Sequence, residues 1–155
     1  IGHALIYCSL HGMDIVSKEK RSRIMSGIKG KNTKPELLLR SALHKLGFRF
    51  RIQRKDLPGK PDIVLPKYKT IIFVHGCFWH QHPGCKFAYM PKSNVEFWTD
   101  KFKKNMTRDQ TVQSLLKEMG WNVIVIWECQ LNNDPVFIQQ CSKLIQGAAG
   151  SSEDF

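Results

Sequence analysis

The segment from residue 75 to residue 85 concentrates side chains that bind metal ions. Together with one distant cysteine it offers four candidate ligands: Cys77, His82, Cys85 and Cys129. Two thiolates and one imidazole in so short a loop can hold a tetrahedral Zn²⁺ once a fourth ligand completes the set. Cys129 can supply it if the strand before it neighbours the strand at 70–74, as consecutive buried strands often do. The spacing predicts a structural zinc site, although small buried thiols without a metal are the alternative.

A second group of residues has the chemistry of a divalent-cation site. Asp62 opens one predicted strand, and the next strand runs through Val74 into His75. A hairpin of these strands would place the Asp62 carboxylate and the Val74 backbone carbonyl near one hard cation such as Mg²⁺. His75 and His80, which the four zinc ligands leave over, suit proton transfer near neutral pH. Read alone, Asp62 also fits an ordinary strand-opening residue, and the histidines fit zinc ligation or exposure.

Three aromatic residues lie in or just after the predicted metal loop: Phe78, Trp79 and Trp98. A loop tethered by ligands on both sides is an unusual place for core residues. Apolar side chains presented beside a basic groove can wedge between base pairs and kink a duplex. The alternative is that they pack beneath the loop, as buried aromatic residues often do.

The charge of the chain is strongly positive and unevenly placed. The net charge is +11 over 155 residues, and residues 18–60 hold fourteen Lys or Arg against three acidic residues. A concentrated basic segment attracts a polyanion by releasing counterions from its phosphates, which favours nucleic acid as partner. A solvated basic face or an anionic lipid surface are the alternatives. No run approaches the roughly 20 apolar residues of a membrane span.

The periodicity of apolar residues predicts four helices and four strands. The helices are predicted at 18–28, 33–47, 96–119 and 135–145. The strands are predicted at 48–52, 62–65, 70–74 and 121–127. The runs at 70–74 and 121–127 are continuous and apolar, which is typical of strands buried on both faces. The order predicts an α/β fold in which helices cover both faces of a mixed sheet, with ligand chemistry at the strand ends.

The length predicts a single domain, which we place at 13–146. Residues 1–12 are expected to be a non-native or disordered extension, and residues 147–155 a flexible tail. No export signal is evident, so a reducing, bacterial-type cytoplasm near the nucleoid is the expected location. Nothing resembles a heptad seam, which favours a monomer.

Several motifs resemble those of the very-short-patch-repair (Vsr) mismatch endonucleases. They are Leu57–Asp62, Ile72–His80, Glu96–Trp98, Lys104–Asp109 and Trp127–Cys129. The resemblance runs from about Ser17 to Leu131 in the family's order, and the string His-Gly-Cys-Phe-Trp-His is highly specific. It implies a restriction-endonuclease-like, three-layer α/β/α fold with a central mixed sheet. It also implies an enzyme that nicks DNA 5′ of the thymine in the T:G mismatch left by deamination of 5-methylcytosine.

The resemblance further implies a role for individual residues. Asp62 and the Val74 carbonyl would bind Mg²⁺, and His80 would activate water with help from Asp109. His75 and Glu36 would complete the phosphate site. The implied DNA wedge consists of Phe78, Trp79, Trp98 and Met25. The four zinc candidates match the family's structural zinc ligands. The chain departs from the family at Val74, where Thr is expected, and at Pro83–Gly84, where the loop is usually rich in His.

Three functions therefore follow from the sequence. The first is a strand-specific mismatch-nicking endonuclease that acts on double-stranded DNA. The second is a zinc-stapled module that binds and bends DNA without cutting it, and the third is a nuclease of the same fold with another DNA target. Only an enzyme explains Asp62, His75, His80 and Asp109. Mismatch-repair proteins or a repair polymerase are expected as partners by family analogy alone.

Overall fold

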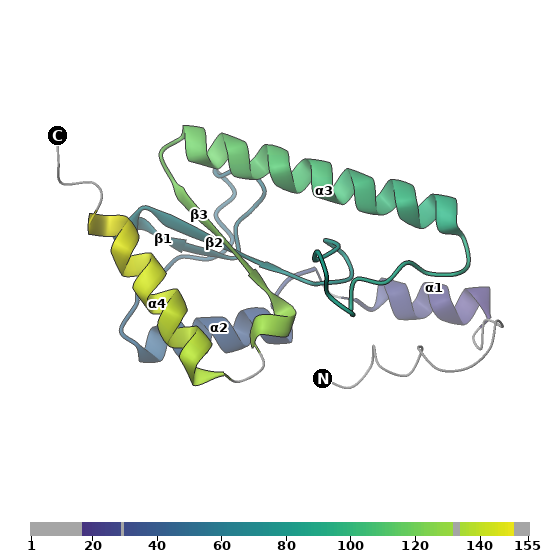
Figure 1. Cartoon of the computed structure of the whole chain (residues 1–155), viewed down its shortest axis with the longest axis horizontal. Coiled ribbons are helices and arrows are strands. Elements are labelled where there is room, and N and C mark those ends of the chain that lie inside the picture. The colour runs from purple at the N-terminus through teal and green to yellow at the C-terminus, as the bar shows by residue number, and fades with distance from the viewer. Residues whose placement is uncertain (1–16, 29, 132–133, 151–155) are drawn as a thin grey trace.

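Figure 1 shows the computed structural model, which describes residues 17–28, 30–131 and 134–150. The predicted extension at 1–12 lies outside these ranges. The elements are α1 (Lys18–Ser26), α2 (Lys34–Lys45), β1 (Ile63–Leu65), η2 (Pro66–Tyr68), β2 (Thr70–His75), α3 (Val95–Glu118), β3 (Asn122–Trp127), η3 (Glu128–Leu131) and α4 (Pro135–Gly150). In the described part of the chain, no helix is both long and apolar enough to span a membrane.

The sheet is mixed, as predicted, and has the order β1-β2-β3. β1 pairs antiparallel with β2, with Ile63 opposite Ile72. β2 and β3 are parallel, in a register that sets His75 beside Trp127. The carboxyl ends of β2 and β3 therefore lie at the same edge, and the loop after β2 starts beside the chain that leaves β3.

Helices pack on both faces of this sheet, as Figure 1 shows. Successive side chains of a strand point to opposite faces, so each strand contributes to two apolar clusters. On the α2 and α4 face the cluster includes Leu39, Leu43, Ile63, Leu65, Ile72, Ile126 and Ile145. On the α3 face it includes Leu57, Val64, Ile71, Phe73 and Leu116. His75 has the same parity as Ile71 and Phe73, which places its side chain on the α3 face.

Two elements differ from the sequence prediction. The strand expected at 48–52 is only an isolated bridge, in which Arg51 and Val64 exchange two backbone hydrogen bonds of 2.8 Å. Gln53 then adopts a left-handed backbone conformation (φ 54°), which ends any extended pairing. The last helix, expected at 135–145, runs to Gly150. Residues 147–150 of the predicted tail therefore belong to this helix.

Gly59 is the residue that lets the turn before Asp62 approach α3. Its φ of +72° favours glycine, and a Cβ built there would lie 2.4 Å from Cγ1 of Val112 on α3. We expect Gly59→Ala to lower the free energy of unfolding by about 2–3 kcal/mol, from backbone strain and overpacking together. Urea denaturation measures this loss.

Gly47→Ala is the matched control for that substitution. Gly47 also has a positive φ (+90°), but a Cβ there would meet no atom within 4 Å. Gly47→Ala should lower the free energy of unfolding by about 1 kcal/mol, from backbone strain alone. Equal losses at both positions would show that the close approach of the turn to α3 contributes nothing.

Candidate active site and metal centre

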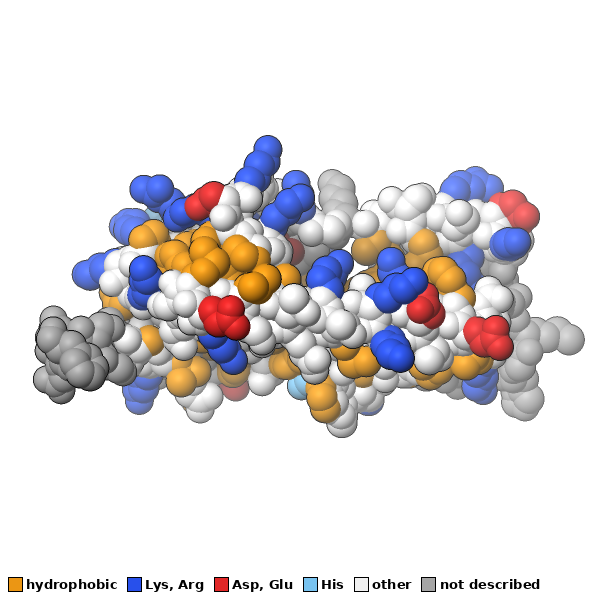
Figure 2. Space-filling model, turned by 90° about the horizontal axis from the view of Figure 1, so that it is seen from above, with side chains coloured by type: hydrophobic (Ala, Val, Ile, Leu, Met, Phe, Trp, Pro, Cys, Tyr) orange, Lys and Arg blue, Asp and Glu red, His pale blue; other side chains and the backbone are white. Residues whose placement is uncertain are grey.

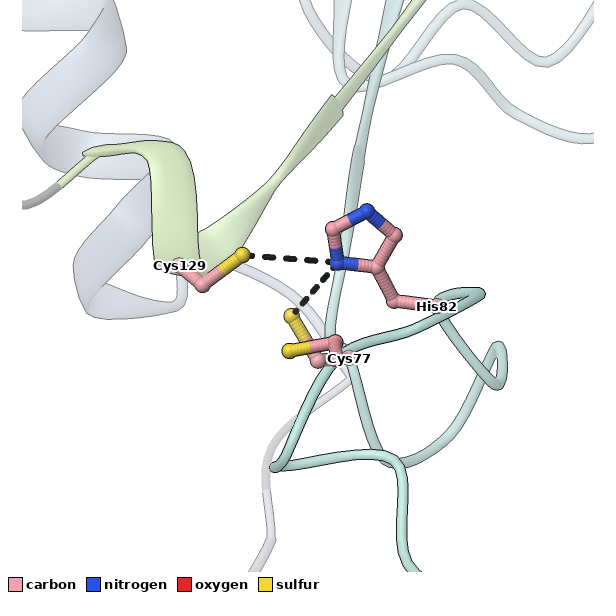
Figure 3. Close-up of side chains that lie close together, drawn as sticks. Cys77, His82 and Cys129 are labelled. Atoms are coloured by element: carbon pink, nitrogen blue, oxygen red, sulfur yellow. Dashed lines mark hydrogen bonds between the residues drawn. The ribbon is translucent and has the colours of Figure 1, made fainter.

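The four predicted zinc ligands come together where the ends of β2 and β3 adjoin. Because His75 is beside Trp127, the chain two residues further on carries Cys77 beside Cys129. The ligand atoms of Cys77, His82, Cys85 and Cys129 all lie within 4.8 Å of one another. His82 Nδ1 is 3.7 Å from Cys77 Sγ and 3.4 Å from Cys129 Sγ, as Figure 3 shows. Tetrahedral zinc with ordinary bond lengths would separate sulfur from nitrogen by about 3.6 Å, so the donor set fits Zn²⁺.

Backbone and ring contacts hold this cluster, which we call the Cys3His cluster. The loop folds on itself through hydrogen bonds from His82 N to Cys77 O (3.0 Å) and from Cys85 N to His82 O (3.2 Å). Cys77 N donates to Glu128 Oε1 at 3.0 Å, which ties the loop to the end of β3. Burial raises the pKa of the Cys77 thiol to about 12, so a bound cation would have to displace its proton.

Asp62 lies just before β1 and faces the end of β2. Its Oδ2 accepts a 2.8 Å hydrogen bond from Val74 N. In a strand, the N–H and C=O of one residue point toward the same neighbour, so the Val74 carbonyl also faces the Asp62 side. Burial, together with the nearby Glu36 carboxylate, raises the pKa of Asp62 to about 6. This arrangement provides oxygen ligands of the kind that a hard divalent cation prefers.

Glu36 is buried beside Asp62 and is held by three donors. Asn32 N donates to its Oε2 (3.0 Å), Thr33 Oγ1 to its Oε1 (2.9 Å), and Arg40 to its Oε2 (3.1 Å). The Glu36 carboxylate thus accepts from the backbone of Asn32, the residue before the N-cap Thr33, and from the Thr33 hydroxyl. The same Arg40 nitrogen also donates to the Asp62 carbonyl at 3.2 Å. Arg40 therefore links the start of α2 to the residue that opens β1.

His75, His80 and Asp109 form a third group, on the α3 face. His80 Nδ1 makes a short hydrogen bond with Asp109 Oδ2 on α3. The rings of His75 and His80 are stacked, with centroids 3.9 Å apart and planes 9° from parallel. Burial lowers the pKa of His75 to about 4, so its imidazole is neutral at pH 7. These three side chains also offer ligand atoms within 4.8 Å of one another.

One open cleft of about 790 Å³ contains both the Asp62–Glu36 pair and the group of His75, His80 and Asp109. The predicted site residues that line it are Glu36, Asp62, Val74, His75, Trp79, His80 and Asp109. Its basic lining residues are Lys31, Arg40, Lys55, Lys60 and Arg108. The sequence did not single out Arg40, whereas Glu128 and Asn105 lay inside family motifs without an assigned role. Asn105 Nδ2 donates a hydrogen bond to the Trp79 carbonyl at 3.0 Å.

The predicted wedge residues pack mainly against one another. Phe78 is at the centre, with ring centroids 5.1–5.4 Å from those of Trp79, Tyr89, Trp98 and Phe102. Trp98 is only 8% exposed, whereas Phe78 and Trp79 are half-buried. Met25 is half-buried on α1, and the cleft lining does not include it. Without DNA, these aromatic side chains form a closed cluster beneath the loop.

The buried Asp62 carboxylate is expected to destabilise the metal-free fold. Its pKa rises on folding from 3.8 to about 6, so the ionised form is disfavoured and stability falls as pH rises through that window. In buffer without Mg²⁺, we expect Asp62→Asn to raise the free energy of unfolding by about 2–3 kcal/mol at pH 8 and by nothing below pH 4. Urea denaturation at the two pH values measures the difference.

Asp56→Asn is the control for the loss of one carboxylate. Asp56 is exposed, and its hydrogen bond with Arg54 lowers its pKa, whereas the pKa of Asp62 is raised. This variant should therefore gain no stability at pH 8. A gain for Asp62→Asn that did not depend on pH would contradict the assignment to the buried charge.

Comparison with known proteins bears on what this cleft is for. A family model described as DNA mismatch endonuclease Vsr matches residues 13–86. The type II nicking enzyme V.XorIIP of Xanthomonas oryzae pv. oryzae is 48% identical over 120 residues, covering 77% of this chain and 88% of that protein. V.NmeAIP of Neisseria meningitidis serogroup A, also named a type II nicking enzyme, is 46% identical over 133 residues, 86% of this chain and 94% of its own. The DNA mismatch endonuclease Vsr of Escherichia coli is 38% identical over 145 residues, 90% of this chain and 92% of its own. With this identity over most of its length, the chain belongs to the Vsr family of DNA mismatch endonucleases.

Proposed function

We propose that this chain is a Mg²⁺-dependent, strand-specific endonuclease that nicks duplex DNA 5′ of the thymine in a T:G mismatch. The observation that carries the proposal is the cleft, in which the Asp62 carboxylate lies with the His80–Asp109 pair among five Lys and Arg side chains. The family supports DNA as substrate, and the names of its relatives support nicking of mismatched DNA.

Asp62 and the Val74 carbonyl would hold the cation, because they face one another and offer hard oxygen donors. Bound Mg²⁺ would stabilise charge on the scissile phosphate and lower the pKa of a coordinated water. Asp62 has to be ionised for this role, and the guanidinium of Arg40 favours that form. Only the carbonyl of Val74 is needed, so Val in place of Thr is compatible with the proposal.

His80 would be the general base. The hydrogen bond from its Nδ1 to Asp109 fixes the ring and leaves Nε2 to accept a proton from water. Asp109 would then stabilise the imidazolium that forms, as a carboxylate does behind a catalytic histidine. The neutral His75 ring stacks on His80 and can donate a hydrogen bond to a phosphate oxygen. Glu36 lies near Asp62, and its carboxylate would be a further negative group at the phosphate site.

DNA binding would follow the basic surface. Figure 2 shows Lys and Arg side chains spread over the face seen from the α3 side, with several acidic ones among them, and five Lys and Arg side chains line the cleft. The wedge into the duplex would come from the aromatic cluster, with Phe78 and Trp79 leading because they are the more exposed. Trp98 would need the cluster to open, and Met25 would approach from α1 on the opposite groove.

The remaining structure would support this site. Zn²⁺ in the Cys3His cluster would be structural, since four protein ligands leave no position for water. Helices on both faces of a mixed sheet support a restriction-endonuclease-like, three-layer α/β/α fold. We further propose a single domain that starts near residue 13 and includes the whole of α4, and that acts as a monomer in a bacterial-type cytoplasm, with mismatch-repair proteins or a repair polymerase as partners.

An end-labelled duplex tests the proposal. One T:G mismatch within a randomised flank is incubated with the protein, with Mg²⁺ and separately with EDTA, beside the matched duplex. We expect a nick 5′ of the mismatched thymine, only with Mg²⁺ and only in the mismatched duplex. Equal cutting of both duplexes would leave a nuclease with another target. Binding without cutting, by folded protein that contains zinc, would instead identify a DNA-bending module.

A further inference from the structure

We propose that Trp127 is a positioning residue that connects the Cys3His cluster to the catalytic histidines. Its indole would fix the orientation of the His75 and His80 rings and so determine the turnover number kcat, rather than DNA affinity. This inference rests on the proposed function, because it assigns a role in the same nicking reaction. Trp127 would thus make the zinc loop part of the catalytic geometry as well as of the fold.

The register of the sheet places Trp127 between the two sites. β2 and β3 pair so that Trp127 is directly beside His75, and paired residues direct their side chains to the same face. The edge of one ring meets the face of the other, with centroids 5.3 Å apart and planes at 76°. The Trp127 ring is also stacked on His82, a ligand of the Cys3His cluster, at 4.2 Å and 10°.

Ring contacts then continue into the catalytic group. His75 stacks on His80 at 3.9 Å, and His80 is hydrogen-bonded to Asp109. Trp127 is thus the ring that contacts both His82 in the Cys3His cluster and His75 in the cleft. It is half-buried and is not a member of either apolar cluster of the described residues, so filling the core does not account for its position.

The physical reason for a catalytic effect is orientation. The hydrogen bond to Asp109 holds His80 Nδ1 in place, but the ring can still tilt about that atom, and stacking on His75 sets its plane. A ring plane set by stacking is kept only while the neighbouring rings remain fixed. His82 would be fixed by the metal, and Trp127 is stacked on it. If Trp127 were removed, the His75 and His80 rings could tilt together and move His80 Nε2 from the attacking water. A misplacement of about 1 Å can cost on the order of 10²-fold in rate.

The test compares Trp127→Leu with Trp127→Phe. Leu removes the flat ring, and Phe keeps one. For Trp127→Leu we expect kcat for nicking the T:G duplex to fall about tenfold or more. KM, the Kd for that duplex and the zinc content should stay close to wild type. Trp127→Phe should recover most of the lost kcat. A wild-type kcat for Trp127→Leu, or a loss confined to KM, would overturn the inference.

Trp121→Leu is the matched control. Trp121 precedes the other end of β3 and packs against the cluster on the α3 face, away from the histidines. It should lose stability without losing kcat. An equal kcat loss in this variant would mean that any damage to β3 slows the reaction, and would also overturn the inference.

His82→Cys keeps the inference testable if Trp127→Leu fails to hold zinc. The change preserves four zinc ligands but removes the imidazole on which Trp127 is stacked. We expect lower kcat with zinc and DNA affinity retained, and an unchanged kcat would overturn the inference. The wild-type protein separates this question from the proposed function: if it does not nick, the proposed function fails, whereas equal nicking by wild type and variants rejects Trp127 alone.

Discussion

Asp62→Asn should lower the rate of nicking a T:G duplex on the order of 10³-fold or more, because it removes the only charged ligand that we assign to the cation. The amide can still accept the hydrogen bond from Val74 N, so the local backbone should not move. The basic lining of the cleft is untouched, and the Kd for the duplex should stay within about threefold. Single-turnover nicking and a binding titration measure the two quantities.

The variant is expected to be more stable than the wild type at pH 8, so unfolding cannot explain a loss of activity. Asp56→Asn removes an exposed carboxylate that pairs with Arg54 and should nick at the wild-type rate. If Asp62→Asn lost binding as strongly as nicking, Asp62 would be a DNA-binding or structural residue. Nicking at more than about a tenth of the wild-type rate would argue against a metal-ligand role.

The parts of the site that the sequence predicted are those that local spacing constrains. Cys77, His82 and Cys85 lie in one short loop, so few conformations keep them apart. Their approach to Cys129 required only that two continuous apolar strands be neighbours, which the β2–β3 pairing confirms. Likewise, the antiparallel pairing of β1 with β2 brings Asp62 to Val74, as the predicted hairpin required.

The spacing of residues along the chain could not predict side-chain contacts between distant elements. His80 and Asp109 are 29 positions apart, and only family resemblance paired them. Arg40 was not singled out, because nothing in a helical pattern shows that a guanidinium will be buried against the Asp62 carbonyl. The strand predicted at 48–52 proved to be a single bridge at Arg51 for the same reason. Alternating apolar residues predict an extended chain, but they do not show whether a neighbouring strand pairs along its whole length.

Cys129→Ser should remove zinc and most of the stability of the domain. The Cys3His cluster joins the loop after β2 to the end of β3, and binding of a structural zinc ion contributes directly to folding. Its apparent binding free energy in small domains is about 10 kcal/mol or more, comparable with the whole stability of a typical domain. We therefore expect less than one zinc per chain and a melting temperature lower by at least about 10 °C.

Cys141→Ala is the control for a cysteine that does not bind the cluster. Cys141 is buried on α4 in the apolar cluster on the α2 and α4 face. Its loss should cost about 1–2 kcal/mol of packing and leave the zinc content at that of the wild type. Zinc content by elemental analysis and thermal unfolding distinguish the two variants. If Cys129→Ser kept both its zinc and its melting temperature, the fourth ligand would have to be another residue, and the zinc loop would not be anchored to β3.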